Sequence, residues 1–252
     1  MARASGAGAA AVDTELDRLG DLAQRAQPVS LARQQILPVL PAFEGLLPEP
    51  GLQRGTVTRV HGPGATSLAL ALLAGCTAAG SWVAAIGVRH LGLGAAGELG
   101  LALERLLLVD APAPQWATAV AAALDGVDAV MLEVPSRARP ADARRLQSRL
   151  RERGAVVVVV GLAGSFQADV VLTASAPSWE GLGLGWGHLG GRRLAVEVTG
   201  RRAASRSRTT QLWLPDAQGL IRREENRRAD EPERRVGREE EVVIPLRPVA
   251  VG

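Results

Sequence analysis

Residues 56–79, TVTRVHGPGATSLALALLAGCTAA, place a strand pattern, a glycine-rich turn and a helix pattern in direct succession. Thr56–Val60 is rich in β-branched residues, and Ser67–Ala79 is long and apolar enough to form a buried helix. Gly62 and Gly64 lie in the turn between them. Because ligands of parallel α/β proteins bind at the first turn from strand to helix, this stretch fixes where a site is sought.

The same alternation of short apolar runs and helix-like runs continues to residue 172. The predicted strands are Trp82–Val88, Leu106–Val109, Ala129–Val134, Ala155–Val160 and Asp169–Leu172, and the predicted helices are Trp116–Leu124 and Asp142–Arg153. A strand such as Val156–Val160, apolar along its whole length, is typical of one that is buried on both faces. We therefore predict an α/β fold with a mostly parallel sheet flanked by helices.

The two ends of the chain differ from this central region. We expect residues 1–44 to hold an amphipathic helix within Asp13–Leu37 and a proline-rich linker, and residues 45–221 to form the core. Within the core, Leu194–Val198 and Gln211–Leu214 are predicted antiparallel strands added at the C-terminal edge of the sheet. Residues 222–252 are predicted to be a charged, disordered tail that ends in a short apolar segment.

The composition excludes several classes of chemistry. Every basic residue of the 252 is arginine, so no lysine can bind phosphate or form a Schiff base. One cysteine, Cys76, rules out a disulfide scaffold, and the three histidines lack the spacing of zinc ligands. We expect no metal, no cofactor and, in the absence of a signal-peptide or membrane-spanning pattern, a cytoplasmic location.

A working phosphate-binding turn combines backbone amides, a lysine that reaches the terminal phosphate, and a hydroxyl that holds magnesium. Here Gly62, Gly64, Thr66 and Ser67 stand near the expected places, and Ala65 stands where the lysine would fall. The turn thus keeps the glycines and hydroxyls of such a site and lacks its charge.

Several segments resemble the ATPase core of the RecA-type recombinases. They are GLQRGTVTRVHGP with GATSLALALL, LGLGAAGELGLALERLLLVDAP, VDAVMLEVP and RLAVEVTGRRAASRSRTTQLWL, which together cover about residues 45–221. The resemblance implies a RecA-like fold of the P-loop NTPase type, in which the last of these segments is similar to the closing hairpin of the recombinase sheet.

The departures from the recombinase pattern all remove catalytic groups. Ala65 stands for the phosphate lysine, Arg89 for the glutamate that activates water, and Glu133 for the aspartate that orients magnesium, while the turn is about three residues short. Phosphoryl transfer depends on positioning and on charge stabilisation, so these changes predict a protein that is not an enzyme. The degenerate nucleotide site that the resemblance implies comprises Gly62, Gly64, Ala65, Thr66, Ser67, Arg89 and Glu133.

Among RecA-like proteins without the lysine, the chain is most similar to the actinobacterial ImuA-type proteins. That resemblance implies an accessory subunit of the SOS response, acting in DNA-damage-induced mutagenic translesion synthesis. The implied partners are an ImuB-like inactive Y-family polymerase homologue and, through it, an error-prone replicative-type polymerase and the sliding clamp, with RecA as a further partner. The expected docking surfaces are the N-terminal helix and an apolar C-terminal segment that contains Ile244, Pro245, Leu246, Val249 and Val251.

Two alternatives stay open at this stage. The chain could be a DNA-binding recombinase paralogue that modulates RecA-type activity, with contacts from Arg137, Arg139, Arg201, Arg202, Arg206 and Arg208. It could also be a residual nucleotide-binding protein or weak ATPase that uses Arg59 or Arg89 in place of lysine. The arginines of Asp142–Arg153 fit either a solvated helix face or a surface for DNA or an acidic partner.

Overall fold

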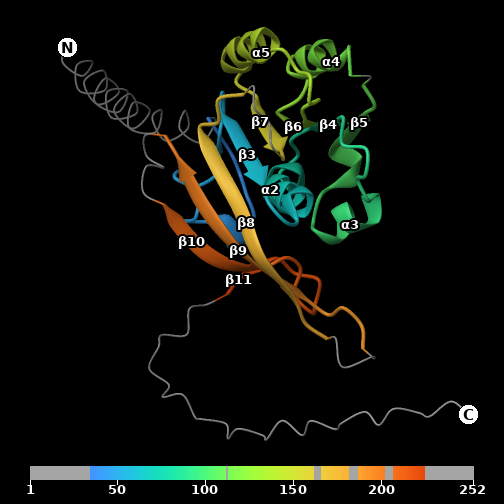
Figure 1. Cartoon of the computed structure of the whole chain (residues 1–252), viewed down its shortest axis with the longest axis vertical. Helices are drawn as coiled ribbons and strands as arrows, with labels where there is room; N and C mark the ends of the chain where they lie inside the picture. Colours follow the sequence, from blue (N-terminus) through green and yellow to red (C-terminus); the bar gives the residue numbers. More distant parts are fainter. Residues whose placement is uncertain (1–34, 112, 162–165, 182–186, 202–206, 225–252) are drawn as a thin grey trace, which may run out of the picture.

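The computed structural model describes residues 35–111, 113–161, 166–181, 187–201 and 207–224. Within these ranges, nine strands form one sheet in the order β11-β10-β9-β8-β3-β7-β6-β4-β5 (Figure 1). Neighbours from β8 to β5 are parallel, whereas β9, β10 and β11 are antiparallel additions. The strands are β3 (Val57–His61), β4 (Val83–Ile86), β5 (Leu106–Val109), β6 (Ala129–Glu133), β7 (Val156–Val160), β8 (Val170–Trp179), β9 (Arg192–Gly200), β10 (Arg208–Trp213) and β11 (Arg222–Arg223).

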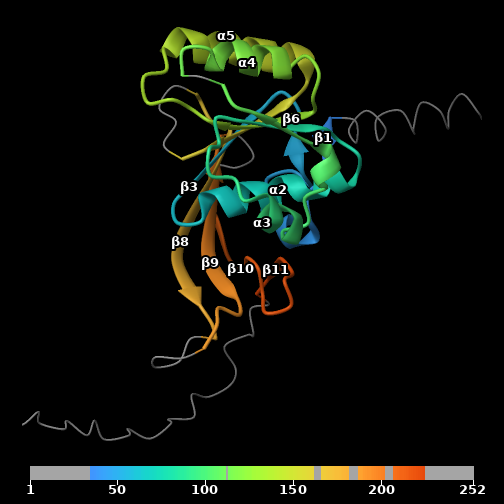
Figure 2. The ribbon, with the colours of Figure 1, turned by 90° about the vertical axis from the view of Figure 1, so that its right-hand side faces the viewer.

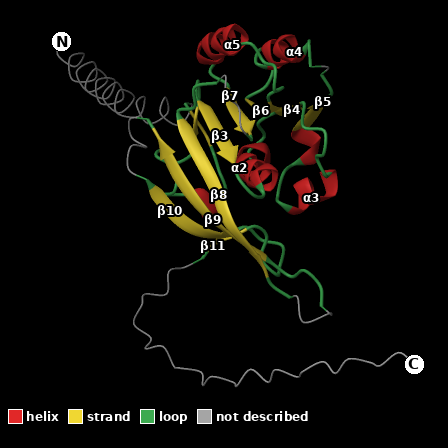
Figure 3. Cartoon of the chain, viewed as in Figure 1, coloured by secondary structure: helices red, strands yellow, loops and turns green. Residues whose placement is uncertain are grey.

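Helices cover both faces of the parallel strands. They are α2 (Ala65–Ala78), α3 (Leu93–Glu98), α4 (Trp116–Ala123) and α5 (Pro140–Arg153), with the short 3-10 helices η1 (Pro41–Phe43) and η2 (Leu103–Arg105). Figures 2 and 3 show α4 and α5 on one side of the sheet and α2 and α3 on the other. Strand β7 is buried along its whole length, because its valines point alternately into the two apolar cores that these layers form.

Helix α2 lies inside the protein, with ten of its fourteen residues buried. The sheet covers one side, and the chain before β2 (Leu52–Gln53) crosses the other, where a Cβ at Gly75 would lie 2.4 Å from the carbonyl carbon of Val39. Leu37 and Phe43 are buried in the same core. A helix enclosed in this way needs apolar residues all round, as its sequence provides.

The structure confirms the predicted α/β class, with a large, mostly parallel sheet and antiparallel strands added after β8. The segment interpreted as a linker packs its apolar side chains into the core and begins a short 3-10 helix at Pro41, where proline is tolerated at the first helical position. The helix predicted over Asp13–Leu37 lies outside the described residues except at its end, where Ile36–Leu37 is a strand, β1, paired with β2. Arg222–Arg223, assigned to the disordered tail, forms β11 beside β10.

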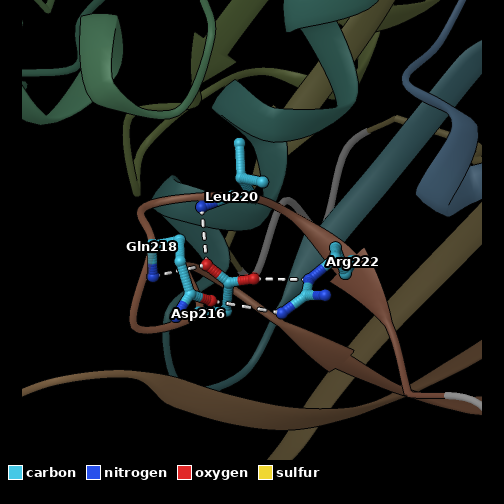
Figure 4. A network of polar contacts seen from close by, with 4 residues as sticks. All are labelled: Asp216, Gln218, Leu220 and Arg222. Carbon is cyan, nitrogen blue, oxygen red and sulfur yellow. Dashed lines mark hydrogen bonds and ion pairs between the residues drawn. The ribbon is translucent and has the colours of Figure 1, made fainter.

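The turn between β10 and β11 is organised around the carboxylate of Asp216, which is 3 % exposed (Figure 4). Burial opposes its ionisation, but the backbone amides of Leu220 and Gln218, each donating over 2.8 Å, and the guanidinium of Arg222 outweigh that cost. The pKa of Asp216 therefore lies below its usual value. The turn is thereby fixed beside the first residues of β9, to which Leu214 and Pro215 hydrogen-bond.

Cys76 provides a direct test of the enclosure of α2. Its thiol is fully buried and donates to the carbonyl of Leu73, and burial raises its pKa to about 12. We expect a disulfide reagent at mildly alkaline pH to modify the native protein on the order of a thousandfold more slowly than the urea-unfolded chain. Equal rates in the two states would show that α2 is accessible to solvent.

Candidate functional site

The turn between β3 and α2 consists of three residues, Gly62–Gly64. Both glycines have positive φ, +98° and +76°, in the left-handed region that favours glycine. A Cβ at Gly62 would lie 2.0 Å from the carbonyl oxygen of Ala174, so the backbone here touches β8 directly. The amide of Ala65 donates to the Gly62 carbonyl over 3.2 Å, which closes the turn.

The first turn of α2 presents backbone amides and no charged side chain. Ala65 is buried, 8 % exposed, and packs into the core, whereas Thr66 and Ser67 are half-buried. No side chain caps the helix. The site therefore offers the positive end of a helix dipole and two hydroxyls, without a side-chain cation from the turn itself.

Arg192, at the start of β9, supplies a cation beside this turn. Its Nη1 would lie 3.2 Å from a Cβ at Gly64, and its guanidinium stands 5.3 Å from the centre of the Trp179 ring. Its Nε donates to the carbonyl of Leu214 over 2.9 Å. Burial lowers the pKa of Arg192, although an arginine remains charged at neutral pH. Arg192 was not among the predicted site residues, since no local pattern in the sequence indicates that β9 returns to the turn.

Arg89 and Glu133 lie at the carboxyl ends of the parallel strands, as the turn does. Both are exposed, Glu133 as the last residue of β6 and Arg89 shortly after β4. Strands are about 4.8 Å apart, so β6 and β4, the second and third strands from β3, lie roughly 10 and 14 Å from it. Arg89 lines a cavity of about 480 Å³ with Leu108 and Asp110. The predicted site residues therefore all lie at the carboxyl ends of parallel strands, but on strands that are spaced apart across the sheet.

Other charged groups near the turn are already engaged. His61, the last residue of β3, is 3.0 Å from the hydroxyl of Thr173, and burial, followed by the positive charge of Arg59, lowers its pKa. Arg59 itself donates to the carbonyl of Gly161 over 3.1 Å. Across the described ranges, no three His, Cys, Asp or Glu side chains lie close enough together to hold a metal ion.

The candidate DNA-contacting arginines lie in different places. Arg137 and Arg139 are exposed in the segment before α5, at the edge that carries the turn. Arg201 and Arg208 lie at the opposite edge, where Arg201 donates to the Gln167 side chain and Arg208 to the carbonyls of Gly45 and Leu47. Arg202, Arg206 and the predicted docking residues Ile244, Pro245, Leu246, Val249 and Val251 lie outside the described residues.

The helices within the described ranges are also too short or too polar to serve as a bilayer-spanning segment.

Comparison with known proteins places the chain in a family. Residues 45–164 match the family model described as the MT3502 N-terminal domain. Over 145 residues the chain is 33 % identical to the Uncharacterized protein Rv3395c of Mycobacterium tuberculosis. This match covers 55 % of the chain and 71 % of the relative. The chain belongs to the MT3502 family.

The match to the MT3502 model spans the part of the protein that carries most of the predicted site. It includes the β3–α2 turn, Arg89, Glu133 and the whole of α5, and it ends before β8. Arg192 and Arg201 thus lie outside the matched region.

Two glycine substitutions separate backbone strain from close packing at the turn of this MT3502-family protein. Gly62 and Gly80 both have φ above +90°, but a Cβ at Gly80 would meet no atom within 4 Å. We expect Gly80→Ala to cost about 1 kcal/mol of unfolding free energy, and Gly62→Ala at least about 2 kcal/mol more, because it also clashes with β8. Urea unfolding measures both, and equal losses would contradict the close approach of Gly62 to β8.

Proposed function

We propose that this MT3502-family chain is a RecA-like protein that acts as a non-catalytic accessory subunit of a DNA-damage-induced mutagenic translesion synthesis complex. Two features of the fold support the RecA-like assignment. The strand before the glycine turn, β3, has parallel neighbours on both sides, and the antiparallel pair β9 and β10 follows β8 where the resemblance implies the closing hairpin.

The composition of the β3–α2 turn is the observation that supports a non-catalytic role. Three residues connect strand to helix, a buried alanine begins the helix, and the chain contains no lysine. Arg89 and Glu133 stand where the resemblance implies a base and a magnesium ligand, and both are exposed at the sheet edge. An architecture kept without its charged groups supports a role in binding rather than in hydrolysis.

A second candidate function, nucleotide binding without hydrolysis, is favoured by one observation. The Arg192 guanidinium lies beside Gly64 and brings a positive charge to the positive end of α2. However, the hydrogen bond to Leu214 and the contact with Trp179 already engage this side chain. Because these contacts fix the guanidinium against Leu214 and Trp179, we infer a structural role for Arg192 beside the turn.

An adaptor needs a surface for its partner, and the outermost strand of the sheet, β5, provides one. In the described part of the chain, β5 pairs with β4 alone, and its Leu107 and Leu108 are 44 % and 53 % exposed. An apolar edge strand with free backbone groups is suited to accept an extended apolar strand from another protein. We propose that the ImuB-like partner adds such a strand to β5, and that the C-terminal apolar segment provides a second contact.

The mycobacterial source of the curated relative agrees with this proposal, because mycobacteria are actinobacteria, the group to which the ImuA-type resemblance points. The proposed partners are accordingly the ImuB-like polymerase homologue and, through it, an error-prone replicative-type polymerase and the sliding clamp, with RecA as a further partner.

Co-expression with the ImuB-like protein tests the adaptor function. We expect the full chain to retain this partner on an affinity column, and Leu107→Glu with Leu108→Glu to reduce retention at least tenfold, since charges at the edge oppose strand addition. Leu220→Glu is the matched control, because Leu220 is 57 % exposed in the β10–β11 turn and should leave retention unchanged. Removal of residues 225–252 should also weaken retention. No retention by the unaltered chain, or full retention by both altered chains, would contradict the proposal.

A further inference from the structure

The segment around α5 carries a large net positive charge. Residues 135–154 contain seven arginines and two acidic residues, a net charge of +5, whereas the whole chain carries +3. The remaining residues are therefore net negative. Figures 1 and 2 show that α5, which occupies most of this segment, lies in the outer layer beside α4 with no drawn helix or strand covering its outer side.

Two of the seven arginines have structural roles. Arg149 and Arg153 both pair with Asp125, just after α4, and the Nε atoms of the two arginines lie 3.0 and 2.9 Å from its Oδ1. The hydrogen bond from Arg149 is the main reason that the pKa of Asp125 lies below its usual value. These pairs fasten the end of α5 to the end of α4.

The side chains of the other five arginines are exposed and, among the residues that the structure describes, form no hydrogen bond or ion pair. They are Arg137, Arg139, Arg144, Arg145 and Arg151. Three belong to α5, which buries Ala143, Leu146, Gln147 and Leu150 against the sheet. Helical geometry places Arg145 opposite these buried residues, and Arg144 and Arg151 together on one flank of the helix. From Arg144 to Arg151, this basic side of α5 rises about 11 Å along the helix axis.

The basic side of α5 lies near arginines that are distant from one another in the sequence. Arg137 and Arg139 precede the N-terminus of α5, and Arg151, near its C-terminus, lines a cavity of about 630 Å³ together with Arg201. Glu49 and Asp169 line this cavity too, so they partly offset the positive charge of Arg151 and Arg201 there. The side-chain partner of Arg201 is the neutral amide of Gln167.

From this arrangement we propose that Arg137, Arg139, Arg144, Arg145, Arg151 and Arg201 form a binding surface for the phosphodiester backbone of nucleic acid. The guanidinium fork matches phosphate oxygens, and a row of such groups along a helix follows a backbone. A protein partner would require an apolar centre, whereas the exposed residues between these arginines on α5 include Ala141 and Ser148. The proposal depends on the placement of charge and is independent of the adaptor function.

The same surface predicts how the nucleic acid is bound. Helix α5 contains no aromatic residue, and the exposed tryptophans of the described ranges, Trp82 and Trp179, lie just before β4 and at the end of β8. Without base stacking or base-edge contacts, binding is expected to be independent of sequence and strongly dependent on salt.

Fluorescence anisotropy with a labelled single-stranded oligonucleotide and its duplex tests this surface on the full chain. At low salt we expect Arg144→Gln, Arg145→Gln and Arg151→Gln together to weaken binding at least tenfold. The slope of log affinity against log salt should fall by about 2 to 3, roughly one per lost phosphate contact. Replacing the same residues by lysine retains the charge, so that control should leave the salt slope unchanged.

Two results would overturn the proposal. One is equal affinity of the unaltered and glutamine-substituted proteins, both with unchanged circular dichroism, which would place nucleic-acid binding elsewhere or nowhere. The other is tighter binding to polyglutamate than to DNA at the same salt concentration, which would make an acidic protein the ligand. Neither result bears on retention of the ImuB-like partner, so the two proposals fail separately.

Discussion

The close contact between the Gly62 backbone and the carbonyl of Ala174 constrains the rest of this protein. It joins the end of β3 to β8 so tightly that only glycine fits, and it directs the chain into α2 after a three-residue turn. Helix α2 then runs through the interior between the sheet and the segment around Val39. The antiparallel strands pack on the same core through Leu194, so the turn, the helix and the added strands form one unit.

In this unit, a short glycine turn leads from a parallel strand into the N-terminus of a buried helix, and no charged side chain comes from the turn itself. Ala65 faces the core, and Arg192 approaches the turn from β9 but is engaged by Leu214 and Trp179. Outside the turn, the free arginines lie along α5, and apolar side chains are exposed on the edge strand β5. These arginines and leucines, and not the turn, are the groups available for contact with other molecules, which is consistent with the proposed role as an accessory subunit.

The sequence predicted those parts of the fold that local patterns determine. The all-valine strand β7, the apolar helix α2 and the glycine turn each have a composition that allows one environment, and their positions agree with the expected ones to within a few residues. The placement of Arg89 and Glu133 at the carboxyl edge follows from the same alternation. Arg192 could not be found in this way, because its position beside Gly64 depends on the path of β9. The burial of Leu37 and Phe43 also depends on tertiary contacts that proline-rich sequence does not reveal.

We propose that the β3–α2 turn of this protein does not bind a nucleotide. Isothermal titration of the full protein with ATP and magnesium tests this proposal, with Arg192→Gln titrated in parallel. No saturable heat is expected with either protein at millimolar nucleotide. Saturable binding that disappears in Arg192→Gln would show that the arginine binds phosphate and that the turn is a working nucleotide site.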